Sequence, residues 1–483
     1  MMNHVLPPSF RTSLKQELLE QKRWHLKPHF KEFDKFSILL QNEFLSQEDY
    51  LSRLQNNLKK LIRFCSRNVP YYKDLFSKIN FRSFDFERIE DFQNIPLLTK
   101  SIVQRYSTEL RARKLPPGER IRGFTKTSGS TGQPLEVLQS VNSTLMFSLL
   151  KQRELRWFRW NPQLVMAAIR PAKDLPLGSD GNLIELGQTC GLNGWQRVGY
   201  FFNTAPFYGF QRANPIEEQK KWLAAIQPAY LIAHPADLEM LALAYQGEKT
   251  PESLRGFLAI AQEITDEMQI RIQNTFKAPV HVNYGLNEVG IVASRCPEGG
   301  RYHIHSEHCF VEIINDEGHF CKPGERGRIL VTSLTNFAMP LLRYDTDDLA
   351  EVIAGPCPCG RSLPSFGRIH GRYRRLVSLP PGVMDYFVAL QHTLNDLPEE
   401  LTKNLRQYQL HHFRNGGFEL RAVVAAPFSP AFREKIMEKW ILVEPQDPAP
   451  LSITEVAQIP RPPGGKYQNF TSDCMPVPSS STQ

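Results

Sequence analysis

The sequence feature that most constrains the fold is an alternation of two kinds of segment after residue 160. Short apolar runs with the length of buried strands occur at 164–170 (LVMAAIR), 229–234 (AYLIAH) and 256–263 (GFLAIAQE). Segments with helical periodicity lie between and after them, at 215–227 and 265–276. Strands that alternate with helices are typical of layered domains in which helices cover a sheet. The sequence therefore predicts an α/β fold.

The length of the chain predicts more than one domain. With 483 residues, it is too long for one compact core, and its 41% hydrophobic content is enough for a globular interior. The first hundred residues have helical patterns. In one of these helices Leu51, Leu54, Leu58, Leu61 and Ile62 are expected close to one face, and Pro70 is expected to stop it.

The pattern changes in the second half of the chain. Short strands at 310–315 and 327–334 alternate with turns, which predicts a β-rich subdomain at about 296–370 within a large N-terminal domain of residues 1–373. A basic stretch followed by Pro-Pro-Gly favours a linker or hinge. Residues 374–472 have the content of a small α+β domain, and 473–483 are expected to form a disordered tail.

Charge and cysteine content limit the kinds of partner. The net charge is +8, but the basic residues are spread along the chain and also suit anionic substrates, so nucleic-acid binding is not implied. The chain begins with MMNHVLPPSF and a charged segment, which favours a cytoplasmic protein without a membrane partner. Eight unevenly spaced cysteines favour metal ligation or burial over a disulfide framework.

A loop rich in hydroxyls and glycines is the first candidate site. It contains Ser128, Gly129, Ser130, Thr131 and Gly132, within the sequence TSGSTGQP. Such a loop can direct backbone N–H groups inward and bind phosphate oxygens, although a plain surface loop has the same composition. It lacks the Gly-Lys-Ser/Thr ending of a Walker loop, so a different phosphate-binding loop is expected.

Further motifs follow in a fixed order. YGLNEVG places Tyr284 and Glu288 at the end of a predicted strand, where ligands bind in open α/β sheets. The segment 343–348 (RYDTDD) forms an acidic cluster that can hold ribose hydroxyls or position a cation, and GRIHGRYRRLV follows at 367–377. Lys466 stands after a Gly-Gly turn. Each motif by itself also fits a solvated turn or a surface charge, and their order is the stronger observation.

In that order, TSGSTGQP, YGLNE, RYDTDD, GR and PRPPGGK resemble the adenylate-forming superfamily of acyl-CoA synthetases and adenylation domains. The opening segments NVPYYKDLF and IPLLTKSIV, within residues 68–103, are similar to the phenylacetate–coenzyme A ligase branch, which includes coenzyme F390 synthetase-like and CapK-like proteins. AIAQEIT at 259–265 is similar to the adenine-binding segment of this branch, usually GAEPWT. The resemblance implies the ANL-type fold, with a large N-terminal domain and a small mobile C-terminal domain.

The resemblance also implies a two-step reaction. The carboxylate of a small molecule, expected to be an aryl acid, attacks the α-phosphorus of ATP to give an acyl-AMP and pyrophosphate, and a thiol then displaces AMP. Charge builds up on phosphate oxygens, so donors and a cation must already be in place. By similarity, Ser128, Thr131 and the glycines hold phosphates, and Glu288 coordinates Mg²⁺, which prefers oxygen ligands.

Other roles follow from the same resemblance. Asp348 accepts hydrogen bonds from ribose with Arg372 nearby, Tyr284 lies beside the adenine, and the backbone of Ala261, Gln262 and Glu263 runs along its edge. Lys466 is the expected catalytic lysine, which bridges the carboxylate and the α-phosphate, and Thr131 and Glu288 complete the catalytic set.

Two positions depart from the family pattern. Arg374 occupies the expected hinge, where an Asp or Lys is usual, so that rotation of the C-terminal domain is in doubt. Asp347 stands where glycine is usual, and a side chain there is strained if φ is positive.

The acceptor of the acyl group stays open at this stage. Coenzyme A is expected, and transfer to a carrier protein or an amine is the alternative. A non-catalytic nucleotide-binding regulatory protein is the alternative of another class, although the intact Lys466, Glu288 and Asp348 argue against it. The oligomeric state is also open, a homodimer included.

Cys296, His303, Cys357 and Cys359 form a set that suits a tetrahedral structural Zn²⁺ site, with His305 as a substitute ligand. Two turns with buried cysteines are the alternative. The stretch 189–210 is rich in aromatic residues and either lines an acyl pocket or belongs to the core. His234 is either near the cleft or caps a helix.

Overall fold

We analysed a computed structural model of the chain, which describes residues 25–26, 33–82, 86–126, 135–262, 264–372, 404–459 and 470–474 and part of 383–402. The chain divides into two compact units: the described residues up to Gly371 belong to the first, and those from Arg372 onward to the second. The predicted domain limit at 373/374 lies at the start of a segment outside the described residues, and its use as a hinge stays a prediction.

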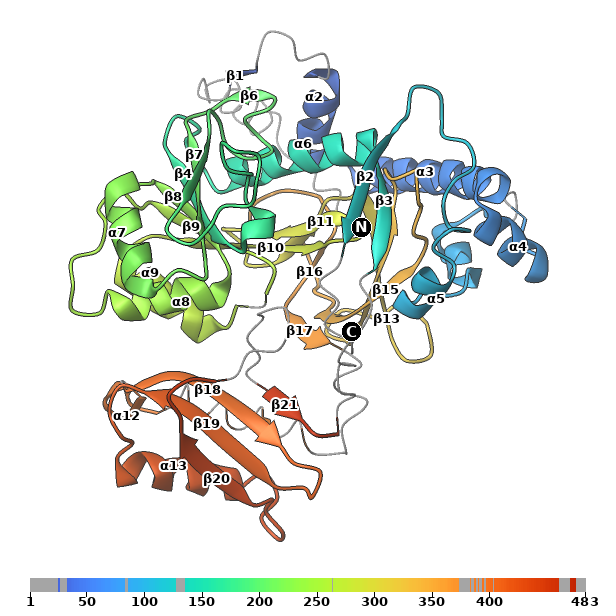
Figure 1. The fold of residues 1–483 in the computed structure, drawn as a ribbon. Helices are drawn as coiled ribbons and strands as arrows, with labels where there is room; N and C mark the ends of the chain where they lie inside the picture. Colours follow the sequence, from blue (N-terminus) through green and yellow to red (C-terminus); the bar gives the residue numbers. More distant parts are fainter. Residues whose placement is uncertain are drawn as a thin grey trace. The chain divides into compact units, whose positions relative to one another are not determined.

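The described residues of the first unit form a large sheet of nine strands, in the order β16-β12-β11-β10-β9-β8-β4-β7-β5 (Figure 1). The strands from β10 to β7 run parallel, and β5, β11, β12 and β16 pair antiparallel. The predicted strands at 164–170, 229–234 and 256–263 are β4, β8 and β9, which confirms the α/β fold. The bounds are β4 (Met166–Arg170), β5 (Thr189–Leu192), β7 (Phe207–Gln211), β8 (Tyr230–Ala233), β9 (Gly256–Ala259), β10 (Val280–Leu286), β11 (Gly290–Arg295), β12 (Tyr302–Ile304) and β16 (Ser365–Phe366).

Helices cover both faces of this sheet, which explains why its central strands are apolar throughout. In β4, Ala167 and Ile169 belong to a core formed with α7, α8 and α9, whereas Met166 and Ala168 belong to a core formed with α6. The helices are α6 (Val141–Trp157), α7 (Ile216–Ile226), α8 (Pro235–Ala244) and α9 (Asp266–Phe276). The predicted helices at 215–227 and 265–276 are therefore confirmed as α7 and α9.

A four-stranded sheet in the order β13-β14-β15-β17 follows in the described chain, with β13, β14 and β15 paired antiparallel. Its strands are β13 (Cys309–Ile314), β14 (Arg326–Ser333), β15 (Tyr344–Glu351) and β17 (Ile369–Arg372). The predicted start of the β-rich subdomain at 296 is wrong, because β12 and β16 pair within the large sheet instead. Strands of two or three residues have no pattern that reveals which sheet they join.

The N-terminal helices pack against this smaller sheet through a shared core. In α3 (Gln47–Asn68), the five apolar residues lie on one face as predicted, and Leu54, Leu58, Leu61 and Ile62 are buried, whereas Leu51, one turn before the others, is 40% exposed. Pro70 begins a new helix, α4 (Pro70–Lys78), after α3 has ended at Asn68. Proline is well tolerated at the first position of a helix because its missing N–H would have no partner there.

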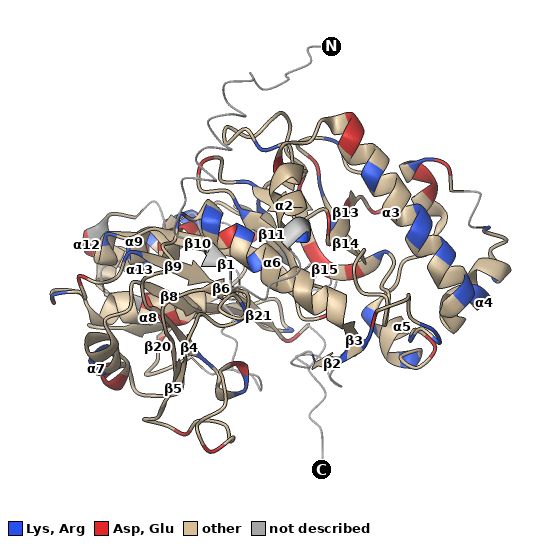
Figure 2. Cartoon of the chain, turned by 90° about the horizontal axis from the view of Figure 1, so that it is seen from above, with Lys and Arg blue, Asp and Glu red and all other residues tan. Residues whose placement is uncertain are grey.

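The charges of α3 follow the helix dipole. Glu48 and Asp49 lie in its first turn and Arg67 in its last, and Figure 2 shows the positions of Lys and Arg residues on α3 and α4 in blue. The remaining described elements of this unit are β1 (His25–Leu26), α2 (Phe33–Gln41), η1 (Asn42–Phe44), η2 (Ile89–Asn94), α5 (Lys100–Arg105), β2 (Ile121–Lys126), β3 (Glu136–Ser140), η3 (Ala172–Asp174) and β6 (Phe202–Asn203).

The second unit has the α+β content expected from the sequence. Its described strands pair in the order β20-β19-β18-β21, with β18 and β19 antiparallel and the outer strands parallel to their neighbours. Phe432 and Trp440 of α13 pack on this sheet. The elements are α12 (Glu399–Thr402), β18 (Leu405–His412), β19 (Phe418–Val424), α13 (Pro430–Ile441), β20 (Leu451–Glu455) and β21 (Phe470–Ser472).

The predicted disordered tail begins too early. The Asp473 N–H donates to the carbonyl of His412 at 2.9 Å, and the Asp473 carboxylate lies 3.3 Å from Nε2 of His411. Asp473 therefore extends the contact between β18 and β21, and residues 475–483 lie outside the described part of the chain.

Candidate functional site

The hairpin of β10 and β11 positions the first predicted site residues. Tyr284 lies on β10 and is 8% exposed, and Glu288 lies in the turn that joins the two strands. The turn is tight, because a Cβ added at Gly285 would lie only 3.0 Å from the carbonyl oxygen of Gly290. The carbonyl of Glu288 accepts a hydrogen bond from Nε2 of Gln139 at 3.1 Å. The turn is therefore held to β3 as well.

Strand β15 carries Tyr344 and Asp348, which bond to the residues of the β10–β11 hairpin. The hydroxyl of Tyr344 donates to Oε1 of Glu288 at 2.9 Å, and the hydroxyl of Tyr284 donates to Oδ2 of Asp348 at 2.8 Å. Each motif thus supplies a tyrosine to the carboxylate of the other motif. We call these two bonds the tyrosine–carboxylate brace. It joins the nine-stranded sheet, through β10, to the four-stranded sheet, through β15, at the predicted site.

Burial and the neighbouring carboxylate keep one of these tyrosines protonated. Burial, and then the charge of Asp348, raise the pKa of Tyr284 well above its ordinary value. The phenol therefore stays a hydrogen-bond donor at neutral pH.

The residues of the acidic cluster at 343–348 have separate hydrogen-bond and ion-pair partners. Asp345 pairs with Arg328 at 2.9 Å, and buried Arg343 pairs with Glu312, so these residues stabilise the smaller sheet. Asp347 has φ of +66°, the strained geometry anticipated for a non-glycine residue there, and its N–H donates to Oδ1 of Asp345 at 3.0 Å.

The predicted adenine segment follows β9. Ala261 has φ of +65°, and Nε2 of Gln262 is buried without a hydrogen-bond partner among the described residues. A buried amide without a partner is costly, and a bound ligand is one way to satisfy it.

Several predicted residues cannot be placed. Arg372 ends β17, but its side chain lies outside the described part of the chain. The others that lie outside it are Ser128, Gly129, Ser130, Thr131, Gly132, Glu263, Arg374 and Lys466.

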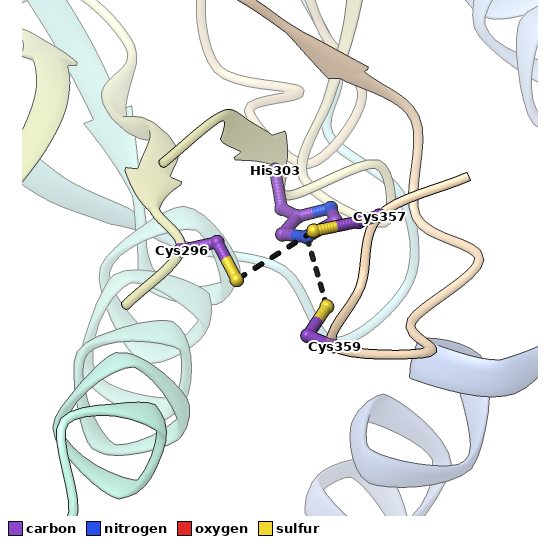
Figure 3. A group of neighbouring side chains, drawn as sticks. All are labelled: Cys296, His303, Cys357 and Cys359. Carbon is purple, nitrogen blue, oxygen red and sulfur yellow. Dashed lines mark hydrogen bonds between the residues drawn. The ribbon is translucent and has the colours of Figure 1, made fainter. Parts of the chain in front are cut away.

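The four predicted zinc ligands come together. The ligand atoms of Cys296, His303, Cys357 and Cys359 all lie within 4.8 Å of one another (Figure 3). The sulfurs of Cys296 and Cys357 are 3.7 Å apart, and Nε2 of His303 lies 3.3 Å from the sulfur of Cys359. Zinc–sulfur bonds of about 2.3 Å in a tetrahedron place two sulfurs about 3.8 Å apart. The set therefore has the composition and spacing of a tetrahedral site.

Two further observations fit a metal here. Hydrogen bonds from Cys296 and His303 lower the pKa of Cys359, which favours the thiolate that binds metals. A Cβ added at Gly299 would clash with the sulfur of Cys357, so this loop must approach the cluster closely. The substitute ligand His305 is not part of the set, because Ser294 and Arg153 hydrogen-bond its two ring nitrogens.

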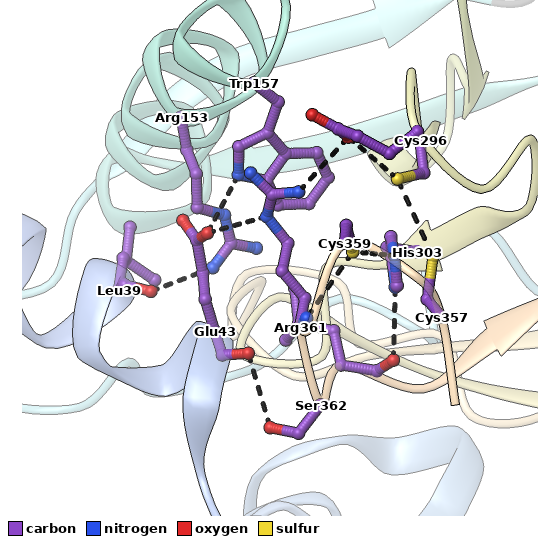
Figure 4. Close-up of polar contacts among 12 residues, drawn as sticks. Leu39, Glu43, Arg153, Trp157, Cys296, His303, Cys357, Cys359, Arg361 and Ser362 are labelled. Carbon is purple, nitrogen blue, oxygen red and sulfur yellow. Dashed lines mark hydrogen bonds and ion pairs between the residues drawn. The ribbon is translucent and has the colours of Figure 1, made fainter. Parts of the chain in front are cut away.

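An ionic network joins the cluster to the N-terminal segment (Figure 4). The Arg361 N–H donates to the sulfur of Cys359 at 3.4 Å, and its guanidinium pairs with Glu43 at 2.9 Å and lies 4.6 Å from the Trp157 ring. The indole N–H of Trp157 also donates to Glu43, at 3.0 Å. Glu43 is 5% exposed, so this carboxylate is buried and paired.

The aromatic stretch 189–210 contributes to the core among its described contacts. Trp195, Phe202 and Phe207 are buried in the cluster beneath α6, whereas Tyr200 is 80% exposed. His234 stands at the N-cap of α8, 3.7 Å from Asp237.

Sequence reasoning missed the partners that hold the predicted residues. Tyr344 was seen only as part of an acidic cluster, and Gln139 and Arg361 were not singled out. The i, i+4 repetition of tyrosine and carboxylate in both YGLNE and YDTDD was the available signal for the brace.

The fold is similar to that of solved CoA ligases. A 2-hydroxyisobutyryl-CoA ligase structure in the postadenylation state matches with a TM-score of 0.70 and 16% identity, over 90% of this chain and 92% of that one. An anthranilate CoA ligase in complex with anthranoyl-AMP matches with a TM-score of 0.52 and 14% identity, over 85% of this chain and 79% of that one. The ANL-type fold predicted from the motifs is thereby confirmed.

By sequence, the chain is similar to phenylacetate-coenzyme A ligases. The enzyme of Thermus thermophilus is 27% identical over 404 residues, 81% of this chain and 84% of that enzyme. That of Escherichia coli is 27% identical over 334 residues, 67% of this chain and 71% of that enzyme. These relatives confirm the predicted resemblance. No family model matches the chain. Within the described residues, no helix has the length and apolar character needed to span a bilayer.

Proposed function

We propose that this protein is an AMP-forming acid–thiol ligase, which activates a carboxylic acid with ATP and transfers the acyl group to coenzyme A. The tyrosine–carboxylate brace carries the proposal, because it brings together two motifs that are 56 to 64 residues apart in sequence. The similarity to phenylacetate-coenzyme A ligases and the fold of CoA ligases agree with this class of reaction.

The described residues have complementary roles in this proposal. Glu288 holds Mg²⁺ and Asp348 accepts hydrogen bonds from the ribose, while Tyr284 lies beside the adenine. The amide of Gln262, which has no hydrogen-bond partner among the described residues, lies next to the backbone proposed to follow the adenine edge. When bound, Mg²⁺ supplies positive charge that neutralises the phosphate oxygens as pyrophosphate leaves.

The residues outside the described part keep the roles that the motifs imply. Ser128 to Gly132 hold the phosphates, with Thr131 in the catalytic set, and Glu263 and Arg372 contact the nucleotide. Lys466 bridges the carboxylate and the α-phosphate, and Arg374 is the pivot of the smaller domain.

For the substrate, we propose an aryl acid, on the strength of the named relatives. Coenzyme A is the proposed acceptor, and a cytoplasmic location and a homodimer stay predictions.

We assign a structural role to a Zn²⁺ ion held by Cys296, His303, Cys357 and Cys359. All four positions are occupied by protein ligands, as in structural rather than catalytic zinc sites. Metal analysis of the purified protein should find one zinc per chain in the parent and a loss in Cys357→Ser.

The test of the reaction is acid-dependent ATP–pyrophosphate exchange with Mg²⁺ and a panel of aryl and short acyl acids. We expect exchange with one acid class, and a loss of about 10²–10³-fold in Lys466→Ala, because a positioned charge at the developing phosphate anion is removed. Thioester formation with coenzyme A is then measured with the acid that supports exchange.

The matched control is Lys435→Ala. Lys435 is an exposed lysine of the same unit, on α13, and pairs only with Glu438 among the described residues. Its removal should leave exchange unchanged. A folded parent that binds ATP but shows no exchange with any acid would instead favour the regulatory, non-catalytic alternative.

A further inference from the structure

The two hydrogen bonds of the tyrosine–carboxylate brace cross between the motifs, because each tyrosine bonds the carboxylate of the other motif and not that of its own. The roles proposed for Glu288 and Asp348 do not require this arrangement. Tyr284 precedes Glu288 by four residues but bonds Asp348, and Tyr344 precedes Asp348 by four residues but bonds Glu288. Each carboxylate is therefore oriented by the motif that carries the other one.

The two bonds are similar in strength and surroundings. Their lengths are 2.8 and 2.9 Å, and the two tyrosines are 8% and 3% exposed. Hydrogen bonds to a charged acceptor contribute more than those between neutral groups. A buried phenol that donates to a carboxylate also fixes which oxygen points toward a ligand.

For Glu288, the consequence concerns the metal. Oε1 accepts the bond from Tyr344, which orients the carboxylate. When Mg²⁺ is bound, this carboxylate would supply it with an oxygen ligand in a fixed orientation. Groups that hydrogen-bond a metal ligand commonly change metal affinity 10–100-fold when removed.

For Asp348, the consequence concerns the nucleotide sugar. Its Oδ2 accepts the bond from Tyr284, and its N–H donates to Oγ1 of Thr346 at 3.1 Å, so side chain and backbone are both held. A carboxylate fixed in this way presents its acceptor atoms to two neighbouring ribose hydroxyls in one geometry.

We infer that Tyr344 is a positioning residue for the divalent cation and Tyr284 is a positioning residue for the ribose, each acting on the carboxylate of the other motif. The inference rests on the proposed function and deepens it, because it divides nucleotide recognition into two separable parts.

The test uses two isosteric variants, Tyr344→Phe and Tyr284→Phe, each of which is the control of the other. Both remove one buried hydrogen bond to a carboxylate and keep the ring. Two binding measurements are made on the full chain: the affinity for Mn²⁺ in the presence of ATP, by electron paramagnetic resonance, and the preference for AMP over 2′,3′-dideoxy-AMP without metal, by calorimetry.

We expect a crossed result. Tyr344→Phe weakens Mn²⁺ binding about 10-fold and leaves the ribose preference as in the parent. Tyr284→Phe lowers the ribose preference about 10-fold and leaves Mn²⁺ binding within about twofold. A structural effect without positioning would move both readouts in both variants, and that result, or no change in either, overturns the inference.

Two further measurements keep the test decisive. Gln139→Ala removes the bond to the backbone of Glu288, and should weaken Mn²⁺ binding without changing the ribose preference, even if a tyrosine variant folds poorly. Pyrophosphate exchange is measured on the parent in parallel. If the two variants show the crossed binding result but the parent shows no pyrophosphate exchange, the proposed reaction is rejected and the positioning roles of the tyrosines stand. If the parent shows exchange but the binding result is not crossed, only the positioning roles are rejected.

Discussion

Two residues of the predicted nucleotide site have left-handed backbone, as do several described residues elsewhere. Ala261 and Asp347 have φ of +65° and +66°, one in each of the two segments proposed to contact the adenine and the ribose. Such a conformation costs residues with a Cβ about 1–2 kcal/mol, less for Asp than for Ala. Strain of this kind persists where surrounding structure fixes the backbone, as it does at ligand sites.

Ala261→Gly should therefore stabilise the first unit. Relief of the left-handed strain exceeds the extra entropy that glycine loses on folding, and we expect a net gain of up to about 1 kcal/mol, a rise of about 1–2 °C in the melting temperature. Thermal unfolding followed by circular dichroism measures it. The matched control is Ala225→Gly in α7, where glycine in an exposed helix position costs about 1 kcal/mol. Equal destabilisation in both variants would contradict the prediction.

At the scale of elements, the cluster of Cys296, His303, Cys357 and Cys359 lies where the N-terminal segment joins the rest of its unit. Ser362 donates its N–H to the carbonyl of Glu43 at 2.8 Å, beside the pair of Arg361 and Glu43. Leu39 accepts a further hydrogen bond from the fully buried Arg153. Segment 33–44 is thus attached to the same loop that carries Cys357 and Cys359.

Arg361→Ala should release segment 33–44 while the rest of the unit stays folded. Removing one partner of a buried ion pair costs about 3–5 kcal/mol, because the other charge is left without compensation. Hydrogen exchange with mass spectrometry should show faster exchange in 33–44 and little change in α3, and a chelator that removes the metal should give the same pattern.

The control for this prediction is Arg368→Ala. Arg368 pairs with Asp266 at 3.4 Å, but both side chains are more than half exposed, so the loss should be below about 1 kcal/mol. Unchanged exchange of segment 33–44 in Arg361→Ala would show that other contacts hold it.

The large sheet and the cysteine–histidine cluster show how much of the structure could be predicted from the sequence. The strands β4, β8 and β9 and the helices between them were predictable, because burial on both faces of a sheet leaves a local apolar pattern. The proximity of Cys296, His303, Cys357 and Cys359 was predictable because few residue types bind zinc, and their use as zinc ligands stays a proposal. The pair of Glu43 and Arg361 was not, since nothing local to either residue records a partner 318 residues away.

At the scale of the whole molecule, buried histidines tie the stability of the first unit to pH. Burial lowers the pKa of His281 and of His308 to about 4. The ring of His281 stacks on Phe158 at 4.1 Å, and His308 is held between Thr335 and the carbonyl of Val289. Both rings are neutral in the folded protein at pH values where the unfolded chain is protonated.

The sign of the pH effect follows from linkage. A histidine whose pKa is lower in the folded state does not reduce the free energy of unfolding above its unfolded pKa of about 6.5. As the pH falls from there toward 4, it lowers the free energy of unfolding by about 1.4 kcal/mol per pH unit. Buried Glu239 and Glu312, with pKa values raised by burial to about 7, act in the opposite direction. The contribution of one histidine must therefore be measured as the difference in the free energy of unfolding between the parent and a variant at that position.

His281→Phe should become more stable relative to the parent as the pH falls, by about 2 kcal/mol between pH 6.5 and pH 5. Urea unfolding of both proteins across this range measures the difference. His319→Gln, which changes an exposed side chain, should show no such trend. A difference that is independent of pH in His281→Phe would contradict the assignment.

The attachment of segment 33–44 has a consequence for the order of events during protein synthesis. Glu43 leaves the ribosome 318 residues before Arg361, and at about 5–20 residues per second this interval lasts roughly 15–60 seconds. During that time its carboxylate stays in water, since the partner that allows its burial has not been made. The first helix among the described residues, α2, is thus among the last to find its place, and chaperones that bind nascent chains have that interval in which to hold it.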